Sequence, residues 1–100
     1  MSGHDFRNIY NLSEKQLEDL DRAEEMLESQ HLNGAEKLLL EMLEKEPKCI
    51  PVLNNLGVLY GKYFLEYEKA INYYNQVLEL EPSNEWARNE RRRYERYTTY

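Results

Sequence analysis

The 100-residue chain contains few of the residues that build turns, disulfides and catalytic sites: three prolines, four glycines, one cysteine and two histidines. So few prolines and glycines favour helices over a fold with many turns. Cys49 is the only cysteine, so no internal disulfide can form, which is compatible with a reducing compartment. No apolar run approaches the ~20 residues of a membrane span, and the N-terminus lacks the layout of a signal peptide. We therefore expect a cytoplasmic protein without a membrane segment.

Charge of both signs is abundant, but it is unevenly distributed. The net charge is −6, and 41% of the residues are hydrophobic, as in a folded globular protein. Residues 1–82 carry 8 basic and 16 acidic side chains, whereas residues 83–100 carry 5 arginines and 3 glutamates. The C-terminal segment is thus electrostatically distinct from the rest of the chain.

The sequence repeats itself after about 35 residues. "EKEP" ends at Pro47 and "ELEP" ends at Pro82, 35 residues later. Within these motifs the offset aligns Glu44 with Glu79 and Glu46 with Glu81, and outside them it aligns three further pairs: Ala35 with Ala70, Leu39 with Tyr74 and Leu43 with Leu78. So many matches at one offset indicate a duplicated unit.

Apolar spacing inside each unit predicts two helices. A capping box of Ser13 and Gln16 begins the first helix, which runs to about residue 30, and a second helix over about 33–46 ends before Pro47. The second unit predicts helices over about 51–63 and 67–80, and the "SN" after Pro82 caps a fifth helix over about 85–97.

Gly57 is conspicuous because it lies within an apolar helical segment, where glycine costs about 1 kcal/mol relative to alanine. Small residues at a crossing let two helix axes approach to about 8 Å. We interpret Gly57 as such a contact point, with Ala23, Ala35 and Ala70 at matching places in the two hairpins. The large neighbours Leu56, Tyr60 and Tyr74 would fill the space around it.

The sequence pattern of the two units resembles that of the tetratricopeptide repeat family. The second unit matches its pattern through Leu53, Leu56, Gly57, Tyr60, Ala70, Tyr74 and Pro82, and the first matches more loosely through Ala23, Met26, Ala35, Leu39 and Pro47. The resemblance implies an all-α fold in which antiparallel helix-turn-helix repeats stack as a short right-handed superhelix of about five helices. Its domain would span 13–97, with repeat one over about 16–49, repeat two over about 50–83 and a capping helix over about 84–97.

The sequence also departs from the family pattern. From Gly57 to Ala70 it has 13 residues where the family has 12, so we expect an atypical turn within residues 63–67. Gln30 and Leu65 occupy or adjoin the place of the family's turn glycine. Arg91 and Arg92 replace Leu-Gly in the last unit, which makes the last helix a cap.

Both ends of such a stack need covering. At the C-terminal end, we expect Trp86, Tyr94 and Tyr97 to cover the second hairpin while the arginines face water. At the other end, residues 1–12 either form a frayed tail or fold back over the first helix through four apolar side chains: Phe6, Ile9, Tyr10 and Leu12. Residues 98–100 would be a short tail.

The resemblance implies a concave groove, lined by the first helix of each repeat, that binds an extended peptide or a partner helix. The corresponding positions are Leu20, Glu24, Leu27, Asn54, Asn55, Val58, Lys62, Asn89 and Arg93. Asparagine suits this role because its amide pairs with a peptide backbone. A carboxylate clamp of the family type is not expected, since only Asn55 and Arg93 match it and Glu24 would repel a carboxylate.

Other functions find less support in the sequence. The histidines, His4 and His31, lie in a tail and a turn, and there is no glycine-rich phosphate loop, so we expect neither an enzyme nor a metal or cofactor site. Tyr63, Tyr67, Tyr97 and Tyr100 are free for an interface. Two alternatives to a peptide-binding scaffold remain: a self-assembling module, and nucleic-acid binding through Arg88, Arg91, Arg92 and Arg96, which the acidic remainder of the chain disfavours.

Overall fold

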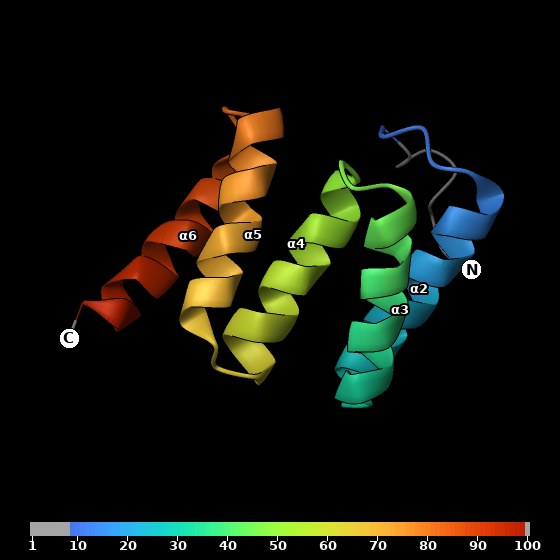
Figure 1. The fold of residues 1–100 in the computed structure, drawn as a ribbon, viewed down its shortest axis with the longest axis horizontal. Coiled ribbons are helices and arrows are strands. Elements are labelled where there is room, and N and C mark those ends of the chain that lie inside the picture. The colour runs from blue at the N-terminus through green and yellow to red at the C-terminus, as the bar shows by residue number, and fades with distance from the viewer. Residues whose placement is uncertain (1–8, 100) are drawn as a thin grey trace. The chain divides into compact units, whose positions relative to one another are not determined.

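The computed structural model describes residues 9–99, and within that range the chain is helical and contains no strand (Figure 1). The elements are α2 (Glu14–Glu28), α3 (Leu32–Lys45), α4 (Ile50–Val58), the π-helical segment η1 (Leu59–Tyr63), α5 (Tyr67–Leu80) and α6 (Glu85–Thr98). The prediction of an all-α chain with about five helices is therefore confirmed, and each helix begins and ends within about two residues of its predicted bounds. The chain divides into two compact units after Cys49.

The N-terminal unit is built around a hairpin of α2 and α3. The predicted capping box is present: the Ser13 hydroxyl accepts from the Gln16 N–H at 3.1 Å, and the Gln16 side chain accepts from the Ser13 N–H at 2.8 Å. The helices bury one face each, through Leu17, Ala23 and Leu27 on α2 and Ala35, Leu38, Leu39 and Met42 on α3. Ala23 and Ala35 are fully buried, as expected for small side chains inside a tight hairpin.

The C-terminal unit consists of α4, η1, α5 and α6, with α5 in contact with the helices on both sides of it (Figure 1). Its core is formed by Val52, Leu53, Leu56, Leu59, Ala70, Tyr74 and Val77, all fully buried. Asn84 caps α6 because its side-chain oxygen accepts from the Ala87 N–H at 2.9 Å. The predicted cap of α6 is thereby confirmed, and the helix begins at Glu85, the residue after the cap.

Between Gly57 and Ala70, the chain accommodates the residue that is extra relative to the tetratricopeptide pattern at a different place from the one we expected. We expected the irregularity within residues 63–67, but the helix itself widens to a π-turn at Leu59–Tyr63, and Phe64 N–H bonds to Leu59 C=O over 3.0 Å. A π-turn accommodates one more residue without breaking the helix. The helix therefore continues to the expected end, and the insertion leaves the backbone hydrogen bonded.

Both hairpin turns use a left-handed residue that is not glycine. Gln30 has φ 64° and Leu65 has φ 57°, the positions at which the turn glycine of the resembled family is absent. In the first turn, the His31 N–H reaches Met26 C=O at 2.8 Å, and in the second the Glu66 N–H reaches Tyr60 C=O at 2.7 Å. These bonds close the C-terminal ends of α2 and η1.

Two glycines in the C-terminal unit lie beneath tyrosine rings. A Cβ atom at Gly57 would lie 2.4 Å from Cζ of Tyr74, and one at Gly61 would lie 2.5 Å from Cζ of Tyr94. The prediction that Gly57 marks a close helix contact is confirmed, but the partner is a large aromatic ring and not a second small residue. Gly61 plays the same role toward α6, and the sequence analysis did not identify it.

Aromatic rings join α6 to the second hairpin. Tyr94 stacks on Tyr67 at 5.6 Å between ring centroids, and Trp86 meets the edge of Tyr74 at 5.5 Å. Tyr97 also contacts Tyr67, at 5.1 Å. The predicted covering of the hairpin is thus observed for Tyr94, which is buried, but Trp86 and Tyr97 are 45% and 51% exposed.

The segment before α2 has little packing in its described part. Ile9 is 79% exposed, as in the frayed-tail alternative, whereas Tyr10 and Leu12 are half-buried. Phe6, also predicted to cover the first helix, lies outside the described residues. None of the helices within residues 9–99 has both the length and the apolar character that a membrane span requires.

Candidate functional site

The nine residues predicted to line a groove fall on three helices in the two units. On α2, in the N-terminal unit, Leu20 is half-buried, Glu24 is exposed and Leu27 is 4% exposed. Leu27 therefore contributes to packing and offers no surface to a partner. The other six residues all belong to the C-terminal unit.

Four of these six lie on α4 and η1. Asn54, Asn55 and Val58 are half-buried, and Lys62 is exposed with its ammonium 5.5 Å from the Tyr63 ring centroid. The Asn55 amide donates to the Pro51 carbonyl at 3.0 Å, so part of its hydrogen-bonding capacity is used inside the helix. The Asn54 side-chain oxygen is buried and has no hydrogen-bond partner.

The remaining two residues, Asn89 and Arg93, lie one turn apart on α6, and both are exposed. Arg93 belongs to a stripe of four side chains spaced i, i+4, i+7 and i+11 along the helix, and Asn89 lies beside it: Trp86, Glu90, Arg93 and Tyr97 form the stripe. The Arg93 guanidinium lies 3.6 Å from the Glu90 carboxylate, and its side chain is 53% exposed. We refer to these four residues as the aromatic–arginine stripe.

Tyr74 lies beneath α6 and contacts Trp86 of the aromatic–arginine stripe. Its ring is fully buried, stacks parallel to Tyr94 at 6.3 Å and touches Trp86 edge-on, yet its hydroxyl has no hydrogen-bond partner. Burial raises the pKa of the Tyr74 hydroxyl, and the neighbouring Glu90 carboxylate raises it further. The pKa of Tyr94 is raised by the same two causes. Both rings therefore stay neutral, and Glu90 is the anionic group beside them.

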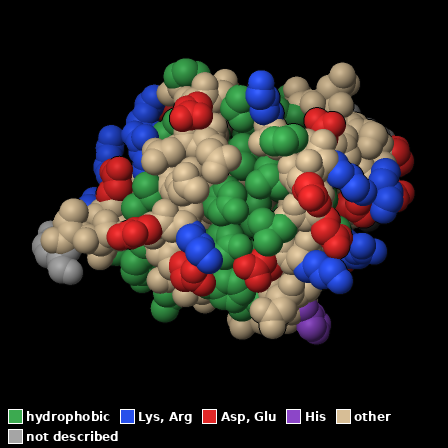
Figure 2. Space-filling model, viewed as in Figure 1, with side chains coloured by type: hydrophobic (Ala, Val, Ile, Leu, Met, Phe, Trp, Pro, Cys, Tyr) green, Lys and Arg blue, Asp and Glu red, His purple; other side chains and the backbone are tan. Residues whose placement is uncertain are grey.

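Three arginines of α6 are exposed, as predicted, namely Arg92, Arg93 and Arg96, whereas Arg88 and Arg91 are half-buried. Figure 2 shows Lys and Arg side chains gathered at its left edge, where α6 lies in Figure 1. Arg88 donates to the Pro82 carbonyl at 2.7 Å, and Arg91 donates to the Asn75 side chain at 2.8 Å. These two bonds link α6 to the middle of α5 and to the connection after it, and they leave Arg92 and Arg96 exposed on the outer face of the helix.

A second surface feature lies on α3, in the N-terminal unit. It is a shallow hollow of about 600 Å³ lined by Lys37, Leu40, Glu41, Leu43, Glu44 and Pro47. Leu40 is 39% exposed there. This hollow contains none of the predicted groove residues.

The part of the chain that the structure describes contains no group of three or more His, Cys, Asp or Glu side chains able to hold a metal ion. Comparisons with protein-family models, with curated proteins and with solved structures found no match to this chain. The resemblance to tetratricopeptide repeats therefore remains a prediction from the residues quoted above.

The sequence analysis named Asn89 and Arg93 as groove residues and Tyr97 as free for an interface, but it did not name Trp86 as a surface residue. Trp86 and Tyr97 were also predicted to cover the hairpin. Their spacing gives the face of the helix but not the depth of each ring. Their exposure could have been inferred from their position near the two ends of the helix. A helix that packs through its middle leaves the side chains at its ends more exposed. Tyr67, a candidate interface residue, is instead held between Tyr94 and Tyr97, and Tyr100 lies outside the described residues.

Proposed function

We propose that this protein is a non-enzymatic scaffold of tetratricopeptide-repeat type that binds a partner peptide or helix through its C-terminal unit. The surface would be made by Asn54, Val58 and Lys62 on α4 and η1 and by the aromatic–arginine stripe with Asn89 on α6. The same proposal includes a superhelical stacking of the repeats, as the resemblance implies.

The aromatic–arginine stripe is the observation that carries this proposal. Trp86, Arg93 and Tyr97 are each about half exposed and lie along one face of α6. Tryptophan, tyrosine and arginine are also the residue types that dominate the binding energy of protein interfaces. Each ring is held in place by Tyr74 or Tyr67, so little side-chain freedom would be lost on binding.

Asn54 adds a polar element to this surface. Its buried side-chain oxygen has no hydrogen-bond partner, and an unsatisfied buried acceptor costs about 1–3 kcal/mol. A small rotation of the side chain would present this oxygen to a backbone N–H of a bound segment. Binding would then remove that cost, which favours an extended peptide with free backbone N–H groups over an apolar ligand.

The test is a selection of displayed random peptides against the intact chain, followed by NMR shift mapping of a selected peptide. We expect shifts at Asn54, Val58, Lys62 and Asn89. Trp86→Ala or Arg93→Ala should weaken binding at least tenfold, corresponding to about 1.4 kcal/mol.

Arg92→Ala is the matched control, because Arg92 lies on the outer face of α6, away from the stripe, and its loss should leave affinity unchanged. A footprint confined to the hollow on α3, or affinity insensitive to Trp86 and Arg93, would contradict the proposal.

A further inference from the structure

One face of α2 carries an acidic row. Glu14, Glu18, Glu25 and Glu28 are exposed, and their spacing of i, i+4, i+11 and i+14 aligns them along the helix. None of the four makes an ion pair within the described part of the chain. We call them the acidic row.

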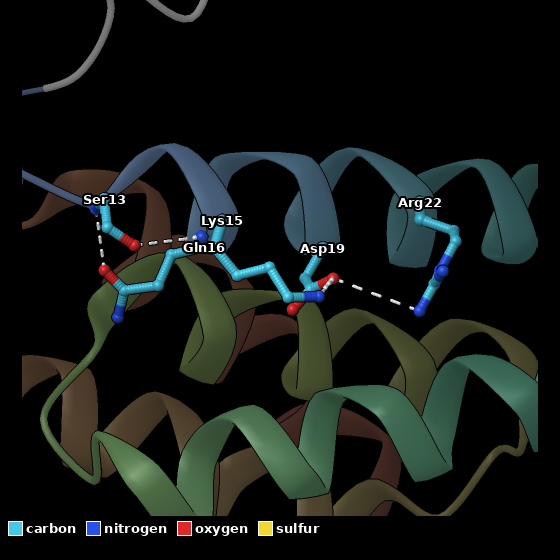
Figure 3. A network of polar contacts seen from close by, with 5 residues as sticks. All are labelled: Ser13, Lys15, Gln16, Asp19 and Arg22. Carbon is cyan, nitrogen blue, oxygen red and sulfur yellow. Dashed lines mark hydrogen bonds and ion pairs between the residues drawn. The ribbon is translucent and has the colours of Figure 1, made fainter.

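The two basic side chains of α2, Lys15 and Arg22, pair with Asp19 and not with the acidic row. The Asp19 carboxylate lies 3.0 Å from the Lys15 ammonium and 3.9 Å from the Arg22 guanidinium (Figure 3). Asp19 is half-buried and lies on the flank of the helix next to the core. The acidic row is thus left without neutralisation from its own helix.

The outer face of α6 carries the opposite charge. Arg88, Arg92 and Arg96 follow one another at four-residue intervals. Arg88 is held by the Pro82 carbonyl, whereas the guanidinium groups of Arg92 and Arg96 have neither an ion pair nor a hydrogen bond among the described residues. We call these three residues the basic row.

The basic row is short enough to lie within the length of the acidic row. With a rise of 1.5 Å per residue, the basic row extends about 12 Å and the acidic row about 21 Å, and neighbouring charges lie about 6 Å apart in the basic row and about 5–10 Å apart in the acidic row. An arginine guanidinium pairs with a carboxylate through two parallel hydrogen bonds, which makes such contacts specific as well as attractive.

We propose that the basic row on α6 of one copy docks on the acidic row on α2 of a second copy. Because the two surfaces differ, the contact is head-to-tail and leaves one row free at each end, so that further copies can add. The basic row lies on the outer face of α6, apart from the aromatic–arginine stripe. This association is therefore separate from the proposed peptide binding.

Sedimentation velocity on the full chain tests the proposal. At low salt we expect the average mass to rise with protein concentration beyond that of a dimer. At about 1 M salt, where the screening length falls to about 3 Å, we expect a monomer at the same concentrations. A monomer at low salt over the whole concentration range, or association that is indifferent to salt, would overturn the proposal.

Two variants that each remove one row make the test specific. Arg92→Gln with Arg96→Gln removes the basic row, and Glu18→Gln with Glu25→Gln removes half of the acidic row, so each variant alone should be monomeric. Mixed in equal amounts, they retain one intact interface and should form a 1:1 dimer and nothing larger.

Lys45→Gln with Lys48→Gln is the matched control, since it changes the net charge as much as the arginine variant does and alters two exposed residues elsewhere. It should associate like the wild type. Loss of association in this control, or failure of the two row variants to pair while both retain wild-type circular dichroism, would rule the interface out.

Discussion

At the scale of single residues, the glycines of this chain differ in what they permit. Gly57 lies beneath the Tyr74 ring, and the methyl group of an alanine there would lie 2.4 Å from Cζ of that ring. Gly34, on α3, faces only the Met26 sulfur at 3.3 Å. A flexible methionine can move aside, whereas a fully buried tyrosine cannot.

We therefore expect opposite effects from the same substitution at these two glycines. Gly57→Ala should lower the free energy of unfolding by about 1–2 kcal/mol, because overpacking outweighs the gain in helix propensity. Gly34→Ala should raise it by up to about 1 kcal/mol. Urea denaturation measures both, and a stabilised Gly57→Ala would show that the contact with Tyr74 is not tight.

The left-handed residues of the turns suggest a stabilising change. Leu65 has φ 57° and is 62% exposed, so its side chain contributes little burial to offset the strain of its backbone. Leu65→Gly should raise the free energy of unfolding by about 0.5–1 kcal/mol, and Gln30→Gly should act similarly. Leu40→Gly, at an exposed position inside α3, should instead destabilise by about 1 kcal/mol. Thermal unfolding distinguishes the three, and equal losses at Leu65 and Leu40 would contradict this account.

At the scale of elements, the closest approach between α6 and the second hairpin is the contact of Gly61 with Tyr94. Gly61 of η1 lies under Tyr94, and a Cβ atom there would fall 2.5 Å from Cζ of that ring. The rings on either side, Trp86 and Tyr97, are half exposed and bury less area. The attachment of α6 therefore depends on the space that Gly61 leaves.

Gly61→Ala should loosen α6 selectively. We expect faster hydrogen exchange of the α6 amides and faster tryptic cleavage after its arginines, with smaller changes in α2 and α3. Adding Tyr94→Leu to Gly61→Ala should restore part of the protection, because the smaller side chain makes room for the methyl group. Uniform loss of protection over all helices would argue against a local role for this contact.

The helices were predictable because their signals are local. The capping box at Ser13, the Asn84 cap and the 3.6-residue apolar spacing depend only on near neighbours in the sequence. The π-turn was not predictable in position, since one extra residue between Gly57 and Ala70 can be absorbed anywhere along that stretch. Its placement at Leu59–Tyr63 keeps Tyr60 stacked on Tyr73 and places Gly61 beneath Tyr94, contacts that only the tertiary structure reveals.

At the scale of the whole molecule, the buried tyrosines predict how stability depends on pH. The folded pKa of Tyr74 is raised, so the folded chain keeps a proton that the unfolded chain loses above the ordinary tyrosine pKa of about 10. This contribution is fully present below about pH 9 and is lost progressively as the pH rises above 10.

Tyr74→Phe tests this dependence. The Tyr74 hydroxyl has no hydrogen-bond partner, so its removal should change stability at pH 7 by less than about 1 kcal/mol. Between pH 10 and pH 11, the variant should lose up to about 1.4 kcal/mol less than the wild type. Chemical denaturation over a pH series measures the difference, and parallel curves for the two proteins would contradict it.

The candidate site was predictable only in part at this scale. Asn54, Val58, Asn89 and Arg93 were named from the resemblance to tetratricopeptide repeats, position by position. A family pattern does not give burial, so Leu27 was included although it lies in the core, and the exposed ring of Trp86 was left out.

The π-turn also affects how residues of this chain should be matched with those of other hairpin proteins. The additional residue lies inside the helix at Leu59–Tyr63, whereas the connection to α5 closes with its own hydrogen bond between Glu66 and Tyr60. An alignment that opens its gap in the connecting loop would therefore shift Tyr60 to Tyr63 by one place. A gap placed at Leu59–Tyr63, where the helix is π-helical, would avoid this shift.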